Sequence, residues 1–391
     1  MSRILGVVAE YNPFHLGHAH HLQAARQAYQ ADYVVVVMSA CFTQRGDAAL
    51  LSPHARARMA LSSGADAVFA LPASWAVRDA EHFALGGVSV LHQLGCSAIS
   101  FGTEFPDIAP LQKAANLLET PDAAFRSAVA RHISGGLLYP AAVAAAADET
   151  LPGAGALLSQ PNSTLAVCYL RALLRLGSQM EVVPVRRDAA YHATTLEDQP
   201  FPSATALRGA ILRGDMHSAE AAMPAGAAAI LRDETLQGRL HRPEALDTAL
   251  LARLRTMTQA DYEGLPDLSE GIEHRLQSAA AASCSRTDLL SAAKTRRYPF
   301  ARLSRLATHA LLGFTHDKLS QAALPSPWLL GYRSDARELI GLLSRQTPLL
   351  TRSADLLAQP WFQAESRAWD LWALGAGLPG GLARTSRLIT L

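Results

Sequence analysis

The sequence contains few lysines, few cysteines and no long apolar run. Its 35 basic residues include only three lysines (Lys113, Lys294 and Lys318), and the formal net charge of +1 excludes a polycation. Four cysteines lie far apart, so they predict neither a disulfide framework nor a zinc site. The apolar runs 33–38 and 141–147 are too short to span a bilayer. We therefore expect a cytoplasmic protein with reduced cysteines, no metal ion held by the protein and no membrane partner.

Short apolar runs alternate with stretches of helical spacing in the first half of the chain. The runs cover residues 4–8, 33–38, 67–71, 98–101 and 180–185. Continuous apolar runs are typical of strands that are buried on both faces, so this pattern predicts an α/β fold with a parallel sheet. Phosphate sites in such sheets lie beyond the carboxyl ends of the strands, which directs attention to the polar segments that follow each run.

Two later parts of the chain have a different pattern. Residues 108–150 are rich in alanine and predict a helical insertion, and strand signals disappear after Arg213. A chain of 391 residues is long enough for two domains. We predict a Rossmann-like, parallel-sheet domain over residues 1–215, with the insertion, and an α-helical domain over residues 216–391.

The turn after the first apolar run is the most informative segment. His15-Leu16-Gly17-His18 follows Asn12-Pro13 and opens a stretch of helical spacing. A helix N-terminus presents free N–H groups, imidazoles can donate to phosphate oxygens, and glycine admits close approach. Helix capping and packing by the histidines is the alternative. A metal site is less favoured, because no further ligands complete a tetrahedral set.

A second helix start follows the proline-rich turn 200–202. Capping alone explains Ser203, whereas Thr205 and Arg208 add a hydroxyl and a guanidinium that can bind pyrophosphate. Paired with the histidine turn, this segment predicts the second half of a triphosphate clamp.

Other polar residues also follow strands. We expect Gly102 to admit a base or ribose against the backbone, and Asn162 is either a helix N-cap or a nucleotide ligand. Arg186 and Arg187 reach phosphate or ribose unless they belong to a solvated loop.

The loop after the second apolar run is also polar. Thr43, Gln44 and Arg45 are candidates to hold a small anionic substrate, whereas we interpret Cys41 as a packing residue. Arg56, in the next helical stretch, either favours an anionic partner or faces solvent.

These motifs, in this order, resemble the tRNA(Met) cytidine acetate ligase family of the nucleotidylyltransferase superfamily. The resemblance is carried by residues 9–15 (Ala-Glu-Tyr-Asn-Pro-Phe-His), 37–39, 42–46, 101–104, 161–163 and 191–192. It covers about residues 4–213 and continues more weakly at 297–302 and 330–332. The sequence departs from the family pattern at Ala40, Cys41, Pro53 and His54, which leaves acyl and tRNA specificity open.

The resemblance implies a nucleotidylyltransferase fold and an ATP-dependent ligase. Acetate and ATP would form acetyl-adenylate and pyrophosphate, and the acetyl group would pass to the wobble cytidine of elongator tRNA(Met), giving N4-acetylcytidine. Activation depends on charge stabilisation at the phosphates, which the resemblance assigns to His15, His18, Thr205 and Arg208, with Mg²⁺ carried by the phosphates. The implied ATP-binding residues are Val7, Val8, Ala9, Glu10, Tyr11, Asn12, Pro13, Phe14, His15, Leu16, Gly17, His18, Ala19, His20, Gly102, Asn162, Arg186, Arg187 and Ser203.

Basic residues concentrate in one part of the second half. Residues 285–309 contain six basic residues and one aspartate, a local charge of +5. Unstacked anticodon bases can be recognised by their edges, and arginines can hold the adjoining phosphates. A solvated helix face explains the same charges equally well. The residues expected to contact tRNA are Arg296, Arg297, Arg302 and Arg305, with Tyr298 and Phe300 among them.

Two other functions stay open at this stage. A nucleotidylyltransferase that makes a small nucleotide coenzyme would use the same clamp, although such enzymes are usually compact single domains. A catalytically silent RNA-binding protein would not need the intact clamp residues. The sequence does not determine the oligomeric state, and a homodimer is retained as one alternative.

Overall fold

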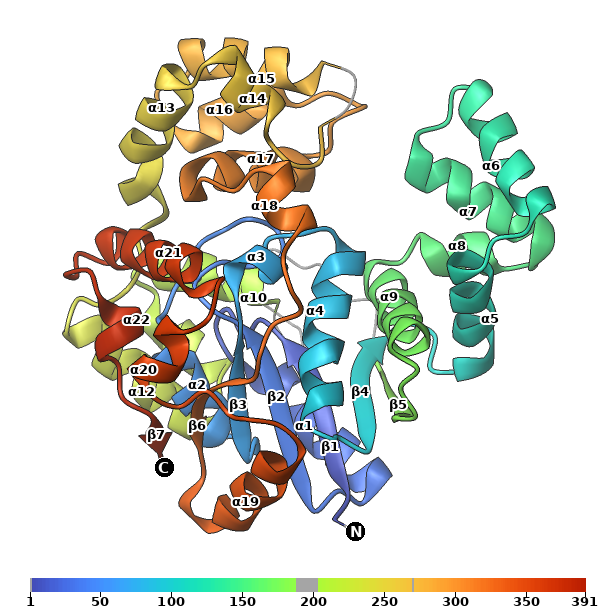
Figure 1. The fold of residues 1–391 in the computed structure, drawn as a ribbon. Helices are drawn as coiled ribbons and strands as arrows, with labels where there is room; N and C mark the ends of the chain where they lie inside the picture. Colours follow the sequence, from blue (N-terminus) through green and yellow to red (C-terminus); the bar gives the residue numbers. More distant parts are fainter. Residues whose placement is uncertain (1, 188–202, 269–270) are drawn as a thin grey trace.

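The seven strands of the structure form one sheet in the order β5-β4-β1-β2-β3-β6-β7 (Figure 1). The structure is a computed structural model that describes residues 2–187, 203–268 and 271–391. β1 is central and runs parallel to both β2 and β4. The carboxyl ends of these strands therefore meet at one edge of the sheet. The strands are β1 (Ile4–Ala9), β2 (Tyr33–Ser39), β3 (Ala67–Leu71), β4 (Ala98–Thr103), β5 (Glu181–Arg186), β6 (Trp328–Tyr332) and β7 (Ile389–Thr390).

Both faces of the sheet are buried, as the continuous apolar runs predict. In β2, Val34 and Val36 belong to one core and Val35 and Val37 to the other, because successive side chains of a strand point to opposite faces. The first core includes α1 (Leu16–Tyr29), α2 (Pro53–Leu61), α10 (Ala204–Leu212), α11 (Met216–Ala221), α12 (Ala225–Leu236), α18 (His316–Ser320), α20 (Ser353–Leu357), α21 (Phe362–Gly375) and α22 (Leu382–Thr385). The second core includes α3 (Ala73–Ala76), α4 (Ala80–Gln93), α5 (Ile108–Glu119), α9 (Pro161–Leu176), the 3-10 helix η3 (Ser334–Ala336) and α19 (Arg337–Gln346).

The α/β fold class is confirmed, but the prediction that strands end after Arg213 is wrong. β6 pairs antiparallel with β3, and β7 pairs with β6. The segment 328–332 is a five-residue apolar run that periodicity alone cannot assign to a strand or a helix. Pairing with β3 makes this segment a strand, because a strand at this position buries Leu329 in one core and Leu330 in the other. The last third of the chain therefore completes the sheet as well as contributing helices.

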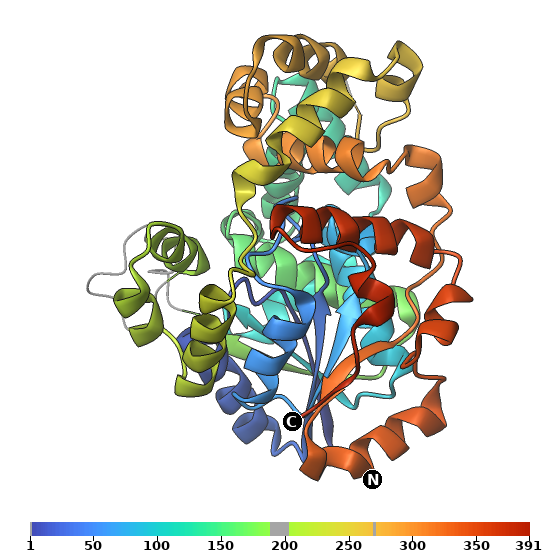
Figure 2. The ribbon, with the colours of Figure 1, turned by 90° about the vertical axis from the view of Figure 1, so that its left-hand side faces the viewer.

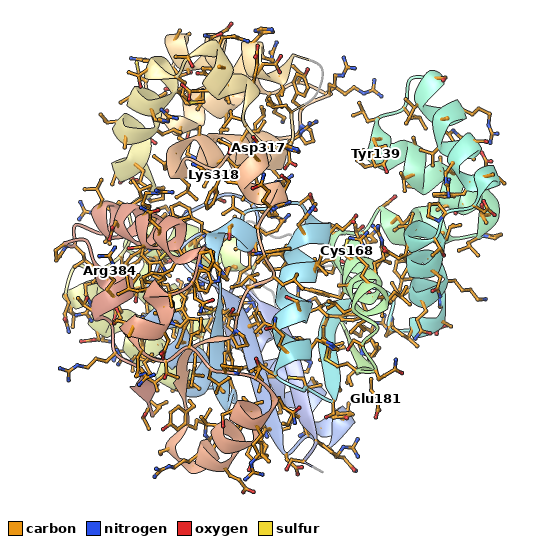
Figure 3. The ribbon with its side chains drawn as sticks, viewed as in Figure 1. Tyr139, Cys168, Glu181, Asp317, Lys318 and Arg384 are labelled. Atoms are coloured by element: carbon orange, nitrogen blue, oxygen red, sulfur yellow. The ribbon has the colours of Figure 1, made fainter. Side chains whose placement is uncertain are left out.

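Two helical units have cores of their own. The first, here called the helical module, stands above the carboxyl edge of the sheet and is reached through the 3-10 helix η2 (Pro243–Leu246) (Figures 1 and 2). The second, here called the arm, projects beside the sheet and carries Tyr139, which is 68% exposed (Figure 3). Within the described ranges, none of the helices has both the length and the apolar character needed to cross a membrane. The module consists of α13 (Asp247–Thr256), α14 (Gln259–Glu263), α15 (Ile272–Ala282), α16 (Arg286–Ala293) and α17 (Phe300–Leu312), and the arm of α6 (Ala123–Ser134), α7 (Tyr139–Thr150) and α8 (Ala154–Leu158).

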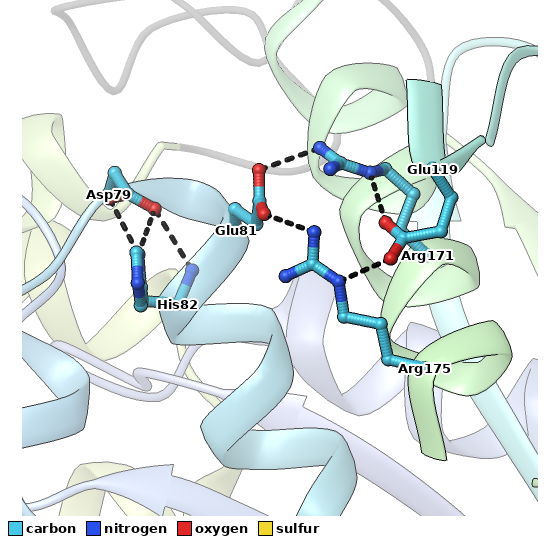
Figure 4. A network of polar contacts seen from close by, with 6 residues as sticks. All are labelled: Asp79, Glu81, His82, Glu119, Arg171 and Arg175. Atoms are coloured by element: carbon cyan, nitrogen blue, oxygen red, sulfur yellow. Dashed lines mark hydrogen bonds and ion pairs between the residues drawn. The ribbon is translucent and has the colours of Figure 1, made fainter. Parts of the chain in front are cut away.

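A network of ion pairs connects three helices at the base of the arm (Figure 4). Arg171 of α9 lies 2.7 Å from Glu81 of α4 and 3.0 Å from Glu119 of α5. Arg175, one turn further along α9, contacts the same two carboxylates at 2.5 Å each. Because both arginines share both acceptors, the network orients α5, which leads into the arm, against the body of the sheet.

The helix α21 returns to the sheet through a buried carboxylate. Glu365 is 1% exposed, and it accepts hydrogen bonds from the backbone N–H of Ala73 (2.6 Å) and from Trp369 Nε1 (3.0 Å). Burial raises the pKa of Glu365 to about 7, although these two hydrogen bonds oppose the shift. The indole of Trp372 donates to the carbonyl of Ala49 (2.6 Å), which joins the same helix to the loop after β2.

Glu365 makes the stability of the fold depend on pH. Its pKa is higher in the folded protein than the ordinary value of 4.5, so the folded state binds the proton more tightly. We expect the free energy of unfolding to fall by at most about 3 kcal/mol as the pH rises from about 4.5 to about 7. Glu365→Gln should remove this dependence, whereas Glu181→Gln at an exposed position should keep it. Urea unfolding at pH 5 and pH 8 measures the difference, and equal pH slopes for wild type and Glu365→Gln would contradict it.

Candidate active site

A cavity of about 410 Å³ lies at the carboxyl edge of the sheet. It is formed by the ends of β1 and β5, the loop after β2, and the first turns of α1, α9 and α10. The histidine turn and the start of α10 therefore line one cavity, although they are far apart in the sequence. The lining residues are Glu10, Asn12, His15, His18, Thr43, Arg45, Asp47, Pro161, Asn162, Arg187, Ser203, Ala204, Thr205 and Arg208.

The two histidines cap α1 and also face the cavity. His15 Nδ1 accepts from the backbone N–H of Gly17 (3.1 Å), and His18 Nδ1 accepts from the backbone N–H of His15 (3.2 Å). Their rings stack with centroids 3.7 Å apart. The capping alternative is thus confirmed, and it has a chemical consequence. An imidazole that accepts at Nδ1 carries its proton at Nε2, so both neutral rings can donate from that atom.

The environment keeps both imidazoles uncharged. Burial, together with the positive charge of Arg187, lowers the pKa of His15 to about 3. Burial also lowers the pKa of His18 well below its usual value, with His15 and Arg187 contributing in the same direction. At neutral pH the pair therefore provides hydrogen-bond donors without positive charge, and cationic contacts to an anion must come from the arginines.

Arg208 connects the two halves of the cavity. Its guanidinium donates to the carbonyl of Asn12 (2.7 Å) and to Thr205 Oγ1 (3.2 Å). The side chain of Asn12 in turn accepts from the backbone N–H of Leu50 (2.8 Å). Ser203 caps α10 by accepting from the backbone N–H of Ala206 (3.0 Å), as capping alone predicted. The turn after β1 and the start of α10 therefore hold each other in place.

Asn162 lies inside the first turn of α9, so its interpretation as an N-cap is wrong. The capping group is Glu104, which follows β4 and accepts from the backbone N–H of Ser163 (2.9 Å) and from Asn162 Nδ2 (2.7 Å). Burial favours the neutral carboxyl, but the hydrogen bonds from Ser163 and Asn162 outweigh it and lower the pKa of Glu104. The role of Glu104 was missed because its partners are distant in sequence.

Because Gly102 has no side chain, the side chain of Arg187 can lie against its backbone. An added Cβ at Gly102 would lie 2.4 Å from Nε of Arg187. The same arginine donates from Nη1 to Asn162 Oδ1 (2.9 Å). A side chain at this position would require the flexible side chain of Arg187 to move, so glycine permits the observed approach of Arg187.

Arg56 is neither solvent-facing nor directed at an anion, which corrects both sequence-based alternatives. It is fully buried and donates to the carbonyls of Leu51 (3.1 Å), Glu10 (2.6 Å) and Ala40. Glu10 also accepts from the backbone N–H of Gln44 (2.5 Å). Arg56 therefore joins the chain segments that leave β1 and β2. No sequence pattern distinguishes such an arginine from a surface one.

Other residues implied to bind ATP lie away from the described cavity walls. Val7 and Val8 lie within β1, His20 is exposed on α1, and Arg186 is exposed at the end of β5. The motif residues Tyr191 and His192 and the turn 200–202 lie outside the described residues. The departures from the family pattern are structural in part, because Ala40 and Cys41 are fully buried and His54 packs edge-on against Trp369.

The basic segment of the module is divided between surface and interior. Arg296 and Arg297 are exposed between α16 and α17, and Phe300 is 47% exposed beside them. Arg302 donates to the carbonyl of Asp267, and Arg305 is half-buried. Tyr298 is 6% exposed and belongs to the module core, so it is not available for stacking on a base.

The described part of the chain contains no group of three or more His, Cys, Asp and Glu side chains that could hold a metal ion. The cavity contains neutral N–H donors, hydroxyls and guanidiniums, together with the carboxyl groups of Glu10 and Asp47. The donors and guanidiniums of this set suit the oxygens of a polyphosphate.

Comparison with known proteins identifies the class. The family model described as HIGH Nucleotidyl Transferase matches residues 2–377, so the chain belongs to this class of enzymes. A tRNA(Met) cytidine acetate ligase of Geobacillus sp. (strain WCH70) is 35% identical over 378 residues, covering 94% of this chain and 93% of the relative. That of Bacillus subtilis (strain 168) is 36% identical over 314 residues, covering 79% and 76%. Within its class, the chain therefore belongs to the tRNA(Met) cytidine acetate ligase family.

Solved structures agree with this assignment. The crystal structure of Thermotoga maritima TmcAL bound with alpha-thio ATP has a TM-score of 0.92 at 27% identity, and all of both chains is covered. The apo structure of the same protein has a TM-score of 0.93, also over both whole chains. The fold and the sequence family therefore coincide over the full length compared.

Loss of the Glu104 carboxylate should weaken the binding of ATP. We expect Glu104→Ala to raise the Kd for ATP about tenfold, because Asn162 and the first turn of α9 lose their shared acceptor. Isothermal titration of ATP measures this change. Glu181→Ala is the matched control, since Glu181 is exposed at the opposite end of the neighbouring strand β5 (Figure 3). Equal affinities for the two variants would contradict the assigned role of Glu104.

Proposed function

We propose that the protein uses ATP to activate acetate as acetyl-adenylate and transfers the acetyl group to the wobble cytidine of elongator tRNA(Met). The products are pyrophosphate, AMP and N4-acetylcytidine. One observation carries the proposal: His15, His18, Thr205 and Arg208 line a single cavity in a chain that belongs to the tRNA(Met) cytidine acetate ligase family.

The first step needs charge stabilisation more than a protein nucleophile. An acetate oxygen attacks the α-phosphorus, the bond to the bridging oxygen breaks, and pyrophosphate leaves with the electron pair. We assign the Nε2–H donors of His15 and His18 to the phosphate oxygens, because preorganised donors stabilise developing charge without reorganisation. Thr205 and Arg208 complete the clamp from the other wall, and Ser203 holds the helix that carries them.

The nucleoside end of ATP is assigned to the opposite wall of the cavity. Asn162 and Arg187 form its described part, and Gly102 lies against Arg187; we retain Gly102, Arg186 and the segment Val7–His20 in the proposal as implied by the resemblance. Mg²⁺ would be carried by the phosphates, since it prefers phosphate oxygens and water to dedicated protein cages. When bound, it would neutralise charge on the departing pyrophosphate.

The tRNA is assigned to the surface that carries Arg296 and Arg297, with Arg302 and Arg305 supporting it from within the module. An adenylate hydrolyses readily, so the site must exclude water until the acceptor base arrives. A cytoplasmic location follows from these substrates. A homodimer remains the assembly to be tested by sedimentation.

One assay tests the proposal against the alternatives. The protein is incubated with ATP and labelled acetate, with and without tRNA(Met), and AMP, pyrophosphate and labelled tRNA are measured. Label on cytidine supports the ligase. Pyrophosphate release with another acceptor but not with acetate indicates a coenzyme-forming nucleotidylyltransferase. An absence of ATP binding and turnover indicates a silent RNA-binding protein.

His18 should matter for activation and not for tRNA binding. We expect His18→Ala to lower acetate-dependent ATP–pyrophosphate exchange at least about 100-fold, because a preorganised donor to the phosphates is lost. The affinity for tRNA should change less than about twofold, since phosphate contacts elsewhere dominate it. His92→Ala, at an exposed position near the C-terminal end of α4, is the control. Equal losses of exchange and tRNA affinity would count against this division of roles.

A further inference from the structure

A second, smaller cavity adjoins the ATP cavity. Its volume is about 120 Å³, and Asp47 and Arg208 line both cavities. The two spaces therefore meet at a carboxylate and a guanidinium. The second cavity lies between the loop after β2, the end of α10 and the helical module, which contributes Leu250, Ala307 and Leu311.

The walls of this second cavity are mainly apolar and well packed. Phe42 and Leu250 are each 1% exposed, and Leu246 is 5% exposed. Leu212, at the end of α10, also lines the cavity but is 48% exposed, so it marks the mouth on the solvent side. The cavity thus has mainly apolar walls, a charged end at Asp47, Arg208 and Arg286, and an entrance beside Leu212, and its lining also includes His241 and Thr308.

The polar end is held rigidly. Arg286 of the module donates to Asp47 Oδ1 (2.8 Å), to the carbonyl of Gly46 (2.9 Å) and to Ser304 Oγ (2.7 Å). Gly46 has a φ of +85°, and an added Cβ would lie 2.8 Å from the backbone of Ser304. The loop after β2 is therefore docked on α17, which fixes the carboxylate of Asp47 between the two cavities.

The volume of the cavity indicates which chemical group of the proposed reaction can occupy it. An apolar cavity of about 150 Å³ accepts a benzene ring, so about 120 Å³ suits one six-membered ring and far exceeds the methyl group of acetate. Flipped bases bind in such pockets, with apolar side chains against the ring faces and polar groups at the ring edge. Of the groups that the proposed reaction brings together near the adenylate, the acceptor base fits this description.

We propose that the cavity receives the pyrimidine ring of the acceptor cytidine, with its exocyclic amine directed at Asp47. This inference rests on the proposed function. In the transfer step, the amine nitrogen attacks the acetyl carbonyl carbon and forms the C–N bond. The C–O bond to the phosphate breaks, AMP leaves with that electron pair, and the carboxylate of Asp47 takes the amine proton.

The same geometry gives a reason for base selectivity. Cytosine has an amine donor at the position where uracil has a carbonyl oxygen. The carboxylate of Asp47 accepts a hydrogen bond from the amine but repels the oxygen. Arg208 lies at the same end, where its guanidinium would donate to acceptor atoms of the ring edge or of the adenylate. Cytosine therefore enters with complementary groups, and uracil does not.

Closing the mouth of the cavity tests the proposal. We expect Leu212→Trp to lower acetyl transfer to tRNA(Met) at least about tenfold, because the larger side chain obstructs entry of the base. Acetate-dependent ATP–pyrophosphate exchange without tRNA should stay within about twofold, since the ATP cavity is unchanged. The control is Leu374→Trp, a similar change at a 58% exposed leucine of α21. Unfolding curves for both variants verify that the fold is retained.

The outcomes are distinguishable. Wild-type protein without acetate-dependent exchange contradicts the proposed function itself. Normal exchange and normal transfer by Leu212→Trp overturn the base pocket while leaving the proposed function intact. If wild type activates butyrate as well as acetate, and Leu212→Trp abolishes only the use of butyrate, then the cavity holds acyl chains and the inference is wrong.

A second variant tests the polar end. Asp47→Asn should lower transfer at least about tenfold more than it lowers exchange, because the amide cannot take the amine proton. Transfer equal to wild type would remove Asp47 from the step, and an equal loss of exchange and transfer would assign it to the ATP cavity alone.

Discussion

A buried guanidinium holds together the two strand ends on which the site is built. Arg56 donates to carbonyls at Glu10, Ala40 and Leu51, so it joins the turn after β1 to the loop after β2. The first of these segments leads to the stacked histidines, and the second leads to Asp47. Both cavities therefore depend on one cation that never reaches solvent. Removing it would leave three carbonyls without their donor, a cost that the surrounding packing cannot recover.

Around this framework, neutral side chains supply directed hydrogen-bond donors and other side chains supply the positive charge. Burial keeps His15 and His18 neutral, so they contribute directed N–H groups, while Arg187 and Arg208 supply positive charge from the opposite walls. A site made only of cations would suffer mutual repulsion when empty. Neutral donors reduce that repulsion and still donate hydrogen bonds to a polyphosphate when it binds.

Elements from the second half of the chain extend the sheet and fix the loop beside the site. β6 extends the sheet beside β3, α21 attaches through Glu365, and Arg286 of the module fixes the loop that carries Asp47. The helical module is therefore coupled to the loop beside the ATP cavity by specific polar contacts. A tRNA bound to the module would be held in a defined position relative to the activated acyl group, which is what transfer between two substrates requires.

Local pattern alone determined the first five strands and directed attention to His15, His18, Thr205 and Arg208, because periodicity and turn chemistry are properties of neighbouring residues. It also led to the correct family. Only the tertiary structure decided that 328–332 is a strand, that Arg56 is buried, that Glu104 caps α9, and that Asp47 lies between two cavities. Each of these outcomes depends on a partner far away in the chain, and a sequence does not record distances in space.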